Sequence, residues 1–176
     1  RRNASMSGLF IRLATDEDAA NLPDIERSAG RAFLAIPGLE WIADDEVMSA
    51  EQHQIHIDEG TVWVALSGER RIGFVTTARD EDALHILELA VESGHQGHGV
   101  GRCLLDTAKD YALDNGLPAL ALTTFRDLPF NELFYRKLGY RTLEAADLSE
   151  RLADILETEI DNGLPGDRRC AMRLDL

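Results

Sequence analysis

The feature that most constrains the fold is a buried-type strand that leads through a glycine-rich loop into an amphipathic helix. Residues 84–91 form a largely apolar run, which predicts a central strand covered on both faces. Residues 100–115 place apolar side chains on one helical face, and Gly116 marks where that helix should end. The loop and the first turn of the helix contain four glycines, Gly94, Gly97, Gly99 and Gly101. We therefore expect a unit of strand, loop and helix at the centre of the fold.

Shorter patterns predict further elements on both sides of this unit. Before it we expect a strand at residues 10–13, a helix start at Thr15, a helix from Pro23 to about residue 34, a surface helix at residues 44–58 and a hairpin of residues 61–66 and 71–77. After it we expect a strand at 119–124, a helix at 131–138, a strand at 140–143, a helix at 148–160 and a strand at 170–174. Helices alternate with strands in this second half, which predicts some parallel pairing. The pattern indicates a single α+β domain over residues 8–176, with a mixed, mainly antiparallel sheet flanked by helices.

Length and charge narrow the class of protein. The 176 residues suffice for one domain with a sizeable core. Eighteen basic and 32 acidic residues give a net charge of −14, a field that repels phosphate backbones and anionic membranes and attracts cationic amines. We therefore expect neither nucleic acid nor a membrane as a partner. The alternative interpretation of the acidity is solubility alone.

The cysteines and the first residues bear on location. Cys103 and Cys170 belong to no CxxC pair and to no zinc spacing, so we expect no disulfide, no metal and a cytoplasmic location. No apolar window approaches the about 18 residues of a membrane span, and no secretory signal is visible. Residues 1–5 precede Met6, and we treat them as a candidate cloning remnant outside the fold.

The glycine-rich loop has the character of an anion-binding cradle. Glycine lets a ligand approach the backbone closely, and the amides at a helix start point outward with the positive end of the helix dipole behind them. Such a cradle suits a pyrophosphate. The spacing of residues 97–101 fits neither GxGxxG nor GxxxxGK[ST], which disfavours a Rossmann or P-loop enzyme. The alternative is a flexible connection without a ligand.

Two segments together resemble the GNAT superfamily of acetyl-CoA-dependent N-acetyltransferases. Residues 96–101 match the family's Q/R-x-x-G-x-G/A loop and follow an apolar strand, as in that family. About thirty residues on, Asn131, Tyr135, Gly139 and Tyr140 match a second family segment, with Tyr140 in place of the commoner phenylalanine. The resemblance is close over residues 84–143 and looser before them.

This resemblance implies a coenzyme site and a general acid. The loop amides would receive the pyrophosphate of acetyl-CoA, a co-substrate, and the strand backbone would pair with its pantetheine arm, while Asn131 touches that arm or neighbouring backbone. Tyr135 would protonate the departing thiolate; its alternative role is packing beside Phe134. The coenzyme-binding set implied is Leu89, Ala90, Val91, Gln96, Gly97, His98, Gly99, Val100, Gly101, Asn131 and Phe134.

The base that deprotonates the acceptor amine has two candidates, His85 and Glu88. They lie three residues apart on a predicted strand, so a regular strand would point them to opposite faces. His85 occupies the place where some members of the superfamily carry a glutamate base. The alternative is that His85 is a half-buried strand residue and Glu88 a surface charge.

Other polar residues allow weaker interpretations. Glu26, Glu40 and Trp41 fall where the superfamily forms its acceptor wall, against an alternative of surface charge and packing. The histidine pairs His53/His56 and His95/His98 are interpreted as solvated surface residues rather than metal ligands. Cys103 is expected to pack within its helix rather than act as a nucleophile.

The functional hypothesis is an enzyme that transfers an acetyl group from acetyl-CoA directly to a primary amine. The acceptor would be a small cationic amine or a peptide amine, and since the superfamily often dimerises, a homodimer is compatible with the resemblance. One alternative is a non-catalytic acyl-CoA-binding regulatory module, which would keep the loop without needing Tyr135. Another is a structural domain with no ligand.

Overall fold

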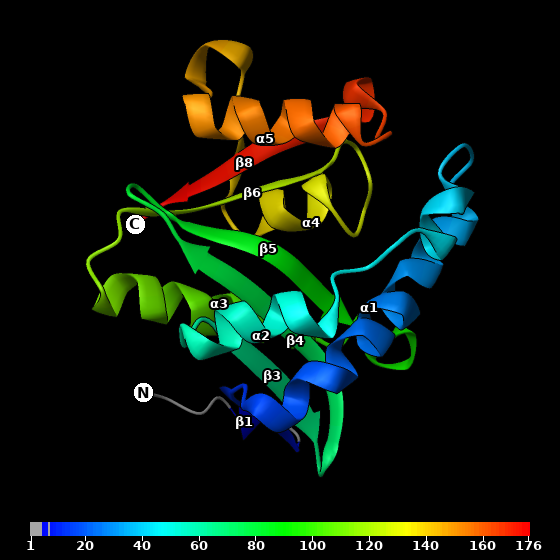
Figure 1. Ribbon diagram of the computed structural model, residues 1–176, viewed down its shortest axis with the longest axis vertical. Coiled ribbons are helices and arrows are strands. Elements are labelled where there is room, and N and C mark those ends of the chain that lie inside the picture. Colours follow the sequence, from blue (N-terminus) through cyan, green and yellow to red (C-terminus); the bar gives the residue numbers. More distant parts are fainter. Residues whose placement is uncertain (1–4, 7) are drawn as a thin grey trace. The chain divides into compact units, whose positions relative to one another are not determined.

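The computed structural model describes residues 5–6 and 8–176 (Figure 1). The segment interpreted as a cloning remnant lies outside the described residues, apart from Ser5. The chain divides into two compact units, which we describe separately. Unit 1 comprises the described residues up to Arg79 together with Ile86–Tyr111, and unit 2 comprises Asp80–His85 and Ala112–Leu176.

Unit 1 is built on an antiparallel meander. Its strands follow the order β1-β2-β3-β4-β5, in which β1 to β4 pair antiparallel. Their bounds are β1 Ser5–Met6, β2 Leu9–Leu13, β3 Val62–Ser67, β4 Arg70–Arg79 and β5 Leu84–Val91. The predicted hairpin is confirmed: Ser67 pairs with Arg70, and Gly68 in the two-residue turn has φ +60°, which glycine adopts without strain.

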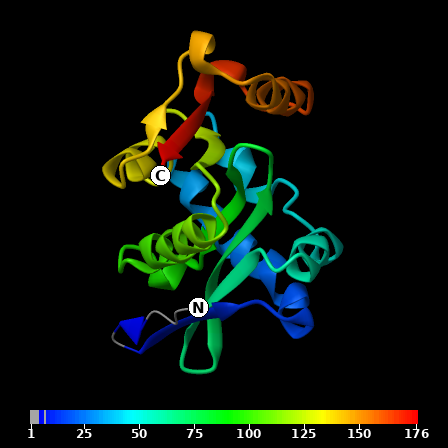
Figure 2. The ribbon, with the colours of Figure 1, turned by 90° about the vertical axis from the view of Figure 1, so that its left-hand side faces the viewer.

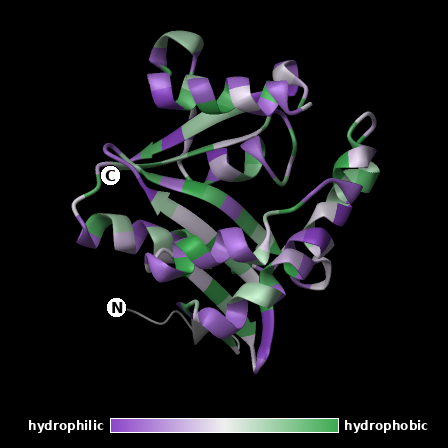
Figure 3. Ribbon diagram, viewed as in Figure 1, coloured by the Kyte–Doolittle hydropathy of each residue, from purple (hydrophilic) through white to green (hydrophobic). Residues whose placement is uncertain are grey.

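Helices cover both faces of these strands. Their bounds are α1 Leu22–Gly30, α2 Ala50–Asp58 and α3 Val100–Asp114, with 3-10 helices at Asp16–Asn21, Arg31–Ala35, Glu40–Asp44 and Ser93–His95. Figure 2 shows α2 and α3 on opposite sides of the strands of unit 1. Leu22 and Ile25 of α1 and Ile57 of α2 pack with Val64 and Phe74 of the sheet. The amphipathic helices alternate hydrophilic and hydrophobic segments, whereas the central strands are largely hydrophobic (Figure 3).

The predicted start of the surface helix at residues 44–58 is wrong. The acidic cluster Asp44-Asp45-Glu46 predicts it there, but α2 begins at Ala50. The Ser49 hydroxyl accepts a hydrogen bond from the Gln52 N–H at 3.1 Å, and the Gln52 side chain accepts one from the Ser49 N–H at 2.9 Å. This capping box satisfies two amides at once and therefore decides where the helix begins.

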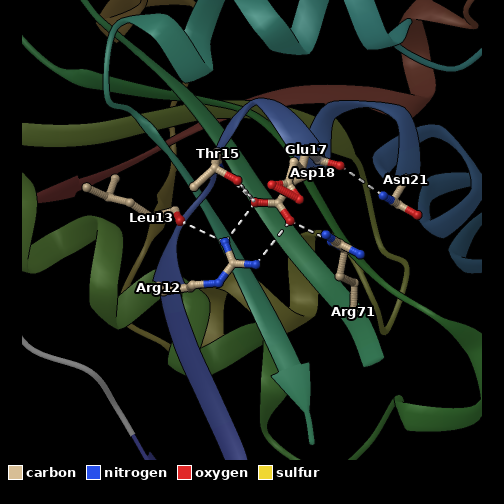
Figure 4. A network of polar contacts seen from close by, with 7 residues as sticks. All are labelled: Arg12, Leu13, Thr15, Glu17, Asp18, Asn21 and Arg71. Atoms are coloured by element: carbon tan, nitrogen blue, oxygen red, sulfur yellow. Dashed lines mark hydrogen bonds and ion pairs between the residues drawn. The ribbon is translucent and has the colours of Figure 1, made fainter. Parts of the chain in front are cut away.

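A buried carboxylate ties β2, β4 and the first 3-10 helix together within unit 1 (Figure 4). Asp18 is 0% exposed and accepts hydrogen bonds from Arg12 Nη1 at 2.7 Å, Arg71 Nε at 2.5 Å and the Thr15 N–H at 2.7 Å. Burial would raise the pKa of Asp18, but these donors outweigh it and hold the pKa far below its usual value. Asp18 is therefore ionised and paired in the folded protein.

Unit 2 contains the parallel pairing predicted for the second half. Leu84 and His85, the first residues of β5, pair parallel with Leu120 and Ala121 of β6. The strand order is β5-β6-β8-β7, with antiparallel pairing of β8 to both neighbours. The bounds are β6 Ala119–Phe125, β7 Arg141–Thr142, β8 Arg169–Asp175, α4 Glu132–Lys137 and α5 Glu150–Asp161, with 3-10 helices at Ala145–Asp147 and Gly166–Arg168.

The α+β class with a mixed, mainly antiparallel sheet and flanking helices is thus confirmed. Within the described part of the chain, every helix is too short or too polar to pass through a bilayer. The boundary of one domain at residues 8–176 stays a prediction.

Candidate functional site

The loop between β5 and α3 presents an exposed, glycine-shaped backbone. Gln96, Gly97, His98 and Gly99 are all exposed. Gly97 and Gly99 have φ values of +80° and +84°, in the left-handed region that other residues enter only at a cost. The Gln96 side chain donates from Nε2 to the Val91 carbonyl at 2.9 Å, which ties the start of the loop to the end of β5.

The amino end of α3 carries amides that the helix itself cannot satisfy. The Cys103 N–H donates to the Gly99 carbonyl at 3.1 Å, the hydrogen bond of a first helical turn. The N–H groups of Val100, Gly101 and Arg102 precede it and have no acceptor within the helix. With the positive end of a 15-residue helix behind them, these amides suit a negatively charged ligand.

The histidines beside this loop differ in their contacts. His98 is exposed, as expected of a solvated residue. His95 has its Nδ1 at 2.8 Å from the Glu92 carboxylate, which also accepts a hydrogen bond from Arg70. Across the described residues, His, Cys, Asp and Glu side chains form no group that could hold a metal ion.

Asn131 in unit 2 has a side-chain oxygen without a hydrogen-bond partner among the described residues. Its Nδ2 donates to Thr124 Oγ1 at 2.9 Å, while its Oδ1 is buried and has no partner among the described residues. A buried carbonyl oxygen without a donor is costly unless a ligand or water supplies one. Asn131 therefore fits the amide-binding role that the resemblance implies, since the pantetheine arm carries amide N–H groups.

Tyr135 lies on α4 and its ring is held by two aromatic neighbours. The residue is 7% exposed, and its ring meets those of Phe134 and Tyr140 edge to face, with centroids 5.2 and 5.4 Å away. Its N–H donates to the Asn131 carbonyl at 3.0 Å. This packing gives the phenol a fixed direction.

Glu132 anchors the short helix that carries Tyr135. Its carboxylate accepts hydrogen bonds from the Asp127 N–H at 2.8 Å, the Thr142 hydroxyl at 2.6 Å and Arg136 at 2.9 Å. These contacts lower the pKa of Glu132 although burial opposes them. The α4 segment is therefore fixed to β7 and to the turn before it.

His85 is held in a polar chain of unit 2. Arg151 donates from Nη1 to His85 Nδ1 at 3.1 Å, and its Nε lies 2.5 Å from Asp80 Oδ2. Because a guanidinium only donates, Nδ1 of His85 must be the unprotonated nitrogen. Burial and the Arg151 charge lower the pKa of His85 to about 4, so the ring is neutral near pH 7 and only weakly basic.

Glu88 in unit 1 contacts a second carboxyl group. Its side chain hydrogen-bonds Glu26 of α1, and the Met48 N–H donates to Glu26 Oε1 at 3.3 Å. Burial raises the pKa of Glu26, although Glu88, Met48 and Arg27 oppose this effect. Glu26 and Glu88 are both half-buried, so part of the pair stays accessible.

The remaining candidates, Glu40, Trp41 and Cys103, differ in their exposure and contacts. Glu40 accepts a hydrogen bond from the Gly38 N–H at 2.9 Å, and Trp41 is 44% exposed. Cys103 is half-buried, and burial together with Asp106 raises the pKa of its thiol, which disfavours a nucleophilic role.

The prediction that His53 lies at the surface is wrong. The residue is 0% exposed, and its Nδ1 lies 2.9 Å from Thr76 Oγ1 of β4. Its ring also packs edge to face on Phe74, with centroids 5.0 Å apart. The polar sequence around His53 gives no signal of this burial. The link between Glu26 and Glu88 also escapes sequence reasoning, because the two residues are far apart in sequence.

Comparison with known proteins identifies the class. The sequence model of the acetyltransferase (GNAT) family matches residues 25–140, about two thirds of the chain. The chain therefore belongs to the acetyltransferase (GNAT) family. N-acetyltransferase 8F1 of Rattus norvegicus is 28% identical over 108 residues, which are 48% of this chain and 49% of that protein. The chain thus spans about half the length of this curated relative.

Solved structures of the same fold cover almost the whole chain. PaiA N-acetyltransferase from Thermoplasma acidophilum, in complex with coenzyme A, has a TM-score of 0.69 and 19% identity, covering 96% of this chain and 99% of its own. N-acetylglutamate synthase from Neisseria gonorrhoeae, complexed with coenzyme A and N-acetyl-glutamate, has a TM-score of 0.72 and 19% identity, covering 98% and 36%. The ribosomal-protein-S18-alanine N-acetyltransferase from Escherichia coli has a TM-score of 0.66 and 17% identity, covering 95% and 93%. At these identities the likeness establishes the fold.

Proposed function

We propose that the protein transfers an acetyl group from acetyl-CoA directly to a primary amine. The observation that carries this proposal is the exposed loop with the positive-φ glycines Gly97 and Gly99, followed by the start of α3, where the N–H groups of residues 100–102 have no acceptor within the helix. Membership of the acetyltransferase (GNAT) family supports it. The coenzyme A bound in the PaiA and N-acetylglutamate synthase structures agrees with the same chemistry in proteins of this fold.

The coenzyme would be held mainly by backbone groups. The amides of residues 96–101 suit the pyrophosphate, because their donors and the helix dipole both favour negative charge. The backbone of residues 89–91 would pair with the pantetheine arm as an added strand does. The family resemblance assigns Asn131 and Phe134 to the same arm, and the Oδ1 of Asn131, which has no partner among the described residues, is an acceptor suited to an amide N–H.

Two groups of this chain would move protons during the transfer. When bound, the coenzyme supplies an activated acetyl thioester. The amine must lose a proton before it can attack, and Glu88 is a better candidate for this base than His85, whose ring is weakly basic and bound to Arg151. Backbone N–H groups would stabilise the negative charge that develops on the carbonyl oxygen. The Tyr135 hydroxyl would then donate its proton to the departing thiolate.

The acceptor would be a small cationic amine or a peptide amine. A net charge of −14 attracts cations over a long range, which favours both classes over anionic acceptors. The free thiols Cys103 and Cys170 agree with a reducing compartment, and we infer a cytoplasmic location on this basis. A homodimer stays a prediction.

Calorimetry with acetyl-CoA and a thiol-release assay test the proposal together. The assay uses spermidine, kanamycin, free lysine and an alanine-initiated peptide as acceptors. We expect Tyr135→Phe to reduce kcat by roughly 10²-fold or more while the coenzyme Kd stays unchanged. Tyr111→Phe is the matched control, because Tyr111 lies in α3 and packs on Trp63.

Three results would contradict parts of this proposal. A wild-type protein that binds acetyl-CoA but releases no thiol with any acceptor would favour a regulatory acyl-CoA-binding module. Absence of binding at millimolar acetyl-CoA would remove both functions. Full activity in Tyr135→Phe would remove Tyr135 as the general acid and leave the transfer itself intact.

A further inference from the structure

The contact between Glu26 and Glu88 brings together two acidic groups from different elements of unit 1. Glu26 lies on α1 and Glu88 on β5, and their carboxyl groups are hydrogen-bonded to each other. Two ionised carboxylates in direct contact repel each other, so the contact requires a proton or a cation between them. Such a pair costs stability, and pairs of this kind are typical of sites that handle protons.

A backbone hydrogen bond holds Glu26, and Glu88 is placed by its position on β5. The Met48 N–H holds Glu26 Oε1 at 3.3 Å. Glu88 and Ala90 lie two residues apart on β5 and so share a face, and Ala90 packs in the core cluster with Phe74, Leu22 and Ile25. Glu88 therefore lies on the face of the sheet that α1 covers. This arrangement lets Glu26 restrain the Glu88 carboxyl.

Charged groups on the elements around α1 are engaged in other contacts. Arg27, whose charge acts on Glu26, forms an ion pair with Asp24 at 2.8 Å. His53 of α2, which packs against β4, is bound to Thr76. Further charged residues on the neighbouring elements have partners of their own, namely Asp16 with Gln54, Asp18 with Arg12 and Arg71, Glu40 with Gly38, and Arg70 with Glu92.

We propose that Glu26 is a positioning residue for Glu88, and that the two carboxylates together accept one proton from the ammonium group of an aliphatic amine acceptor. This inference rests on the proposed function and defines its acceptor as an amine that is cationic near neutral pH. The ammonium N–H bond breaks and its electron pair stays on nitrogen as the lone pair that attacks. The proton forms an O–H bond shared between the carboxylates, so the pair changes from two negative charges to one, which is the state that the hydrogen-bonded contact represents.

Glu26 makes this base stronger than an isolated glutamate. Because a second carboxylate disfavours ionisation of the first, the pair binds its shared proton more tightly. Burial also raises the pKa of Glu26, although its hydrogen bond to Glu88 acts in the opposite direction. A base of higher pKa takes a proton from an ammonium more readily, but it is available only at higher pH. Removing Glu26 should therefore move the acid limb of activity to lower pH and also lower the rate on the plateau.

The variant Glu26→Gln tests this directly. Gln keeps the oxygen that accepts from the Met48 N–H and removes only the ionisable group, so the fold is expected to persist, which far-UV circular dichroism checks. Glu69→Gln is the matched control, because it makes the same change at the exposed β3–β4 turn. Glu88→Gln assigns the Glu88 signal.

Carbon NMR of protein labelled at the glutamate carboxyl carbon follows the titration without any acceptor. We expect Glu26→Gln to lower the titration midpoint of Glu88, with no change in Glu69→Gln. The pH profile of kcat/KM, measured with the acceptor that releases thiol fastest from acetyl-CoA, should show its acid limb at lower pH and a reduced plateau in Glu26→Gln alone.

The outcomes separate this inference from the proposed function. A Glu88 midpoint that does not respond to Glu26→Gln overturns the inference alone, and so does an acid limb that stays in place while thiol release continues. Absence of thiol release from every protein, wild type included, overturns the proposed function and with it any role of the pair in that reaction.

Discussion

The buried Asp18 allows a stability prediction from a single charge. The substitution Asp18→Asn keeps the size of the side chain and one carbonyl oxygen but removes the negative charge that faces Arg12 and Arg71. The new amide group also turns a donor toward one of these guanidinium groups. Both arginines then lose their ionic partner in a site where Asp18 itself has no exposed surface.

The size of the effect follows from burial. Removing one partner of a buried ion pair costs about 3–5 kcal/mol. The Arg12 and Arg71 side chains are 30% and 28% exposed, so water can partly solvate them and the loss should fall near about 3 kcal/mol. For a chain of this length that corresponds to a fall in Tm of roughly 6–12 °C.

Urea unfolding followed by circular dichroism measures this loss, with Asp24→Asn as the control. The Asp24–Arg27 pair has exposed side chains on both sides, so its loss should cost about 0–1 kcal/mol. Because the pKa of Asp18 is lower in the folded protein, its contribution is complete above the unfolded pKa of about 4 and is lost as the pH falls below it. A loss in Asp18→Asn no larger than in Asp24→Asn, or an unchanged acid limb of stability, would refute the reasoning.

Two further predictions concern the loop and a buried histidine. Gly97 has φ +80°, and an added methyl group there would meet only open space. Gly97→Ala should therefore cost about 1 kcal/mol of backbone strain and weaken acetyl-CoA binding severalfold, as measured by calorimetry. Gly94→Ala, which is also in open space but lacks a positive φ, should change neither stability nor binding. Burial lowers the pKa of His53 to about 4, so its neutral form stabilises the fold fully above about pH 6.5, and this stability, at most about 3 kcal/mol, is lost as the pH falls from there toward 4. Urea unfolding at pH 7 and pH 5 should show a smaller difference in His53→Gln than in the wild type, and equal differences would contradict this.

The strand, loop and helix at residues 84–115 could be predicted from the sequence because their signals are local. The apolar run of β5, the glycines after it and the single apolar face of α3 each depend on neighbours in the chain. The start of α2 was missed because acidic residues at Asp44–Glu46 imitate a helix beginning, whereas the deciding contact is the reciprocal bond between Ser49 and Gln52.

The chemistry of single side chains could not be predicted in the same way. His53 is buried and its Nδ1 contacts Thr76, 23 residues away, and nothing in the polar sequence of α2 indicates that contact. Glu88 could be proposed as a base from its place before the loop, but its partner Glu26 comes from another element. His85 likewise gains its lowered pKa from burial and from Arg151 of α5. Tertiary contacts determine these properties, so patterns of residue type do not reveal them.

The bond from the Gln96 side chain to the Val91 carbonyl limits how an extended ligand can join the end of β5. A carbonyl oxygen has two lone pairs, and one of them is already used. The N–H of a pantetheine amide would have to share the Val91 carbonyl oxygen with the Gln96 side chain. A ligand carbonyl that accepts from the Val91 N–H would not compete with that side chain. The polarity of the arm, and hence the direction in which it runs along the strand, is thereby biased before any ligand arrives.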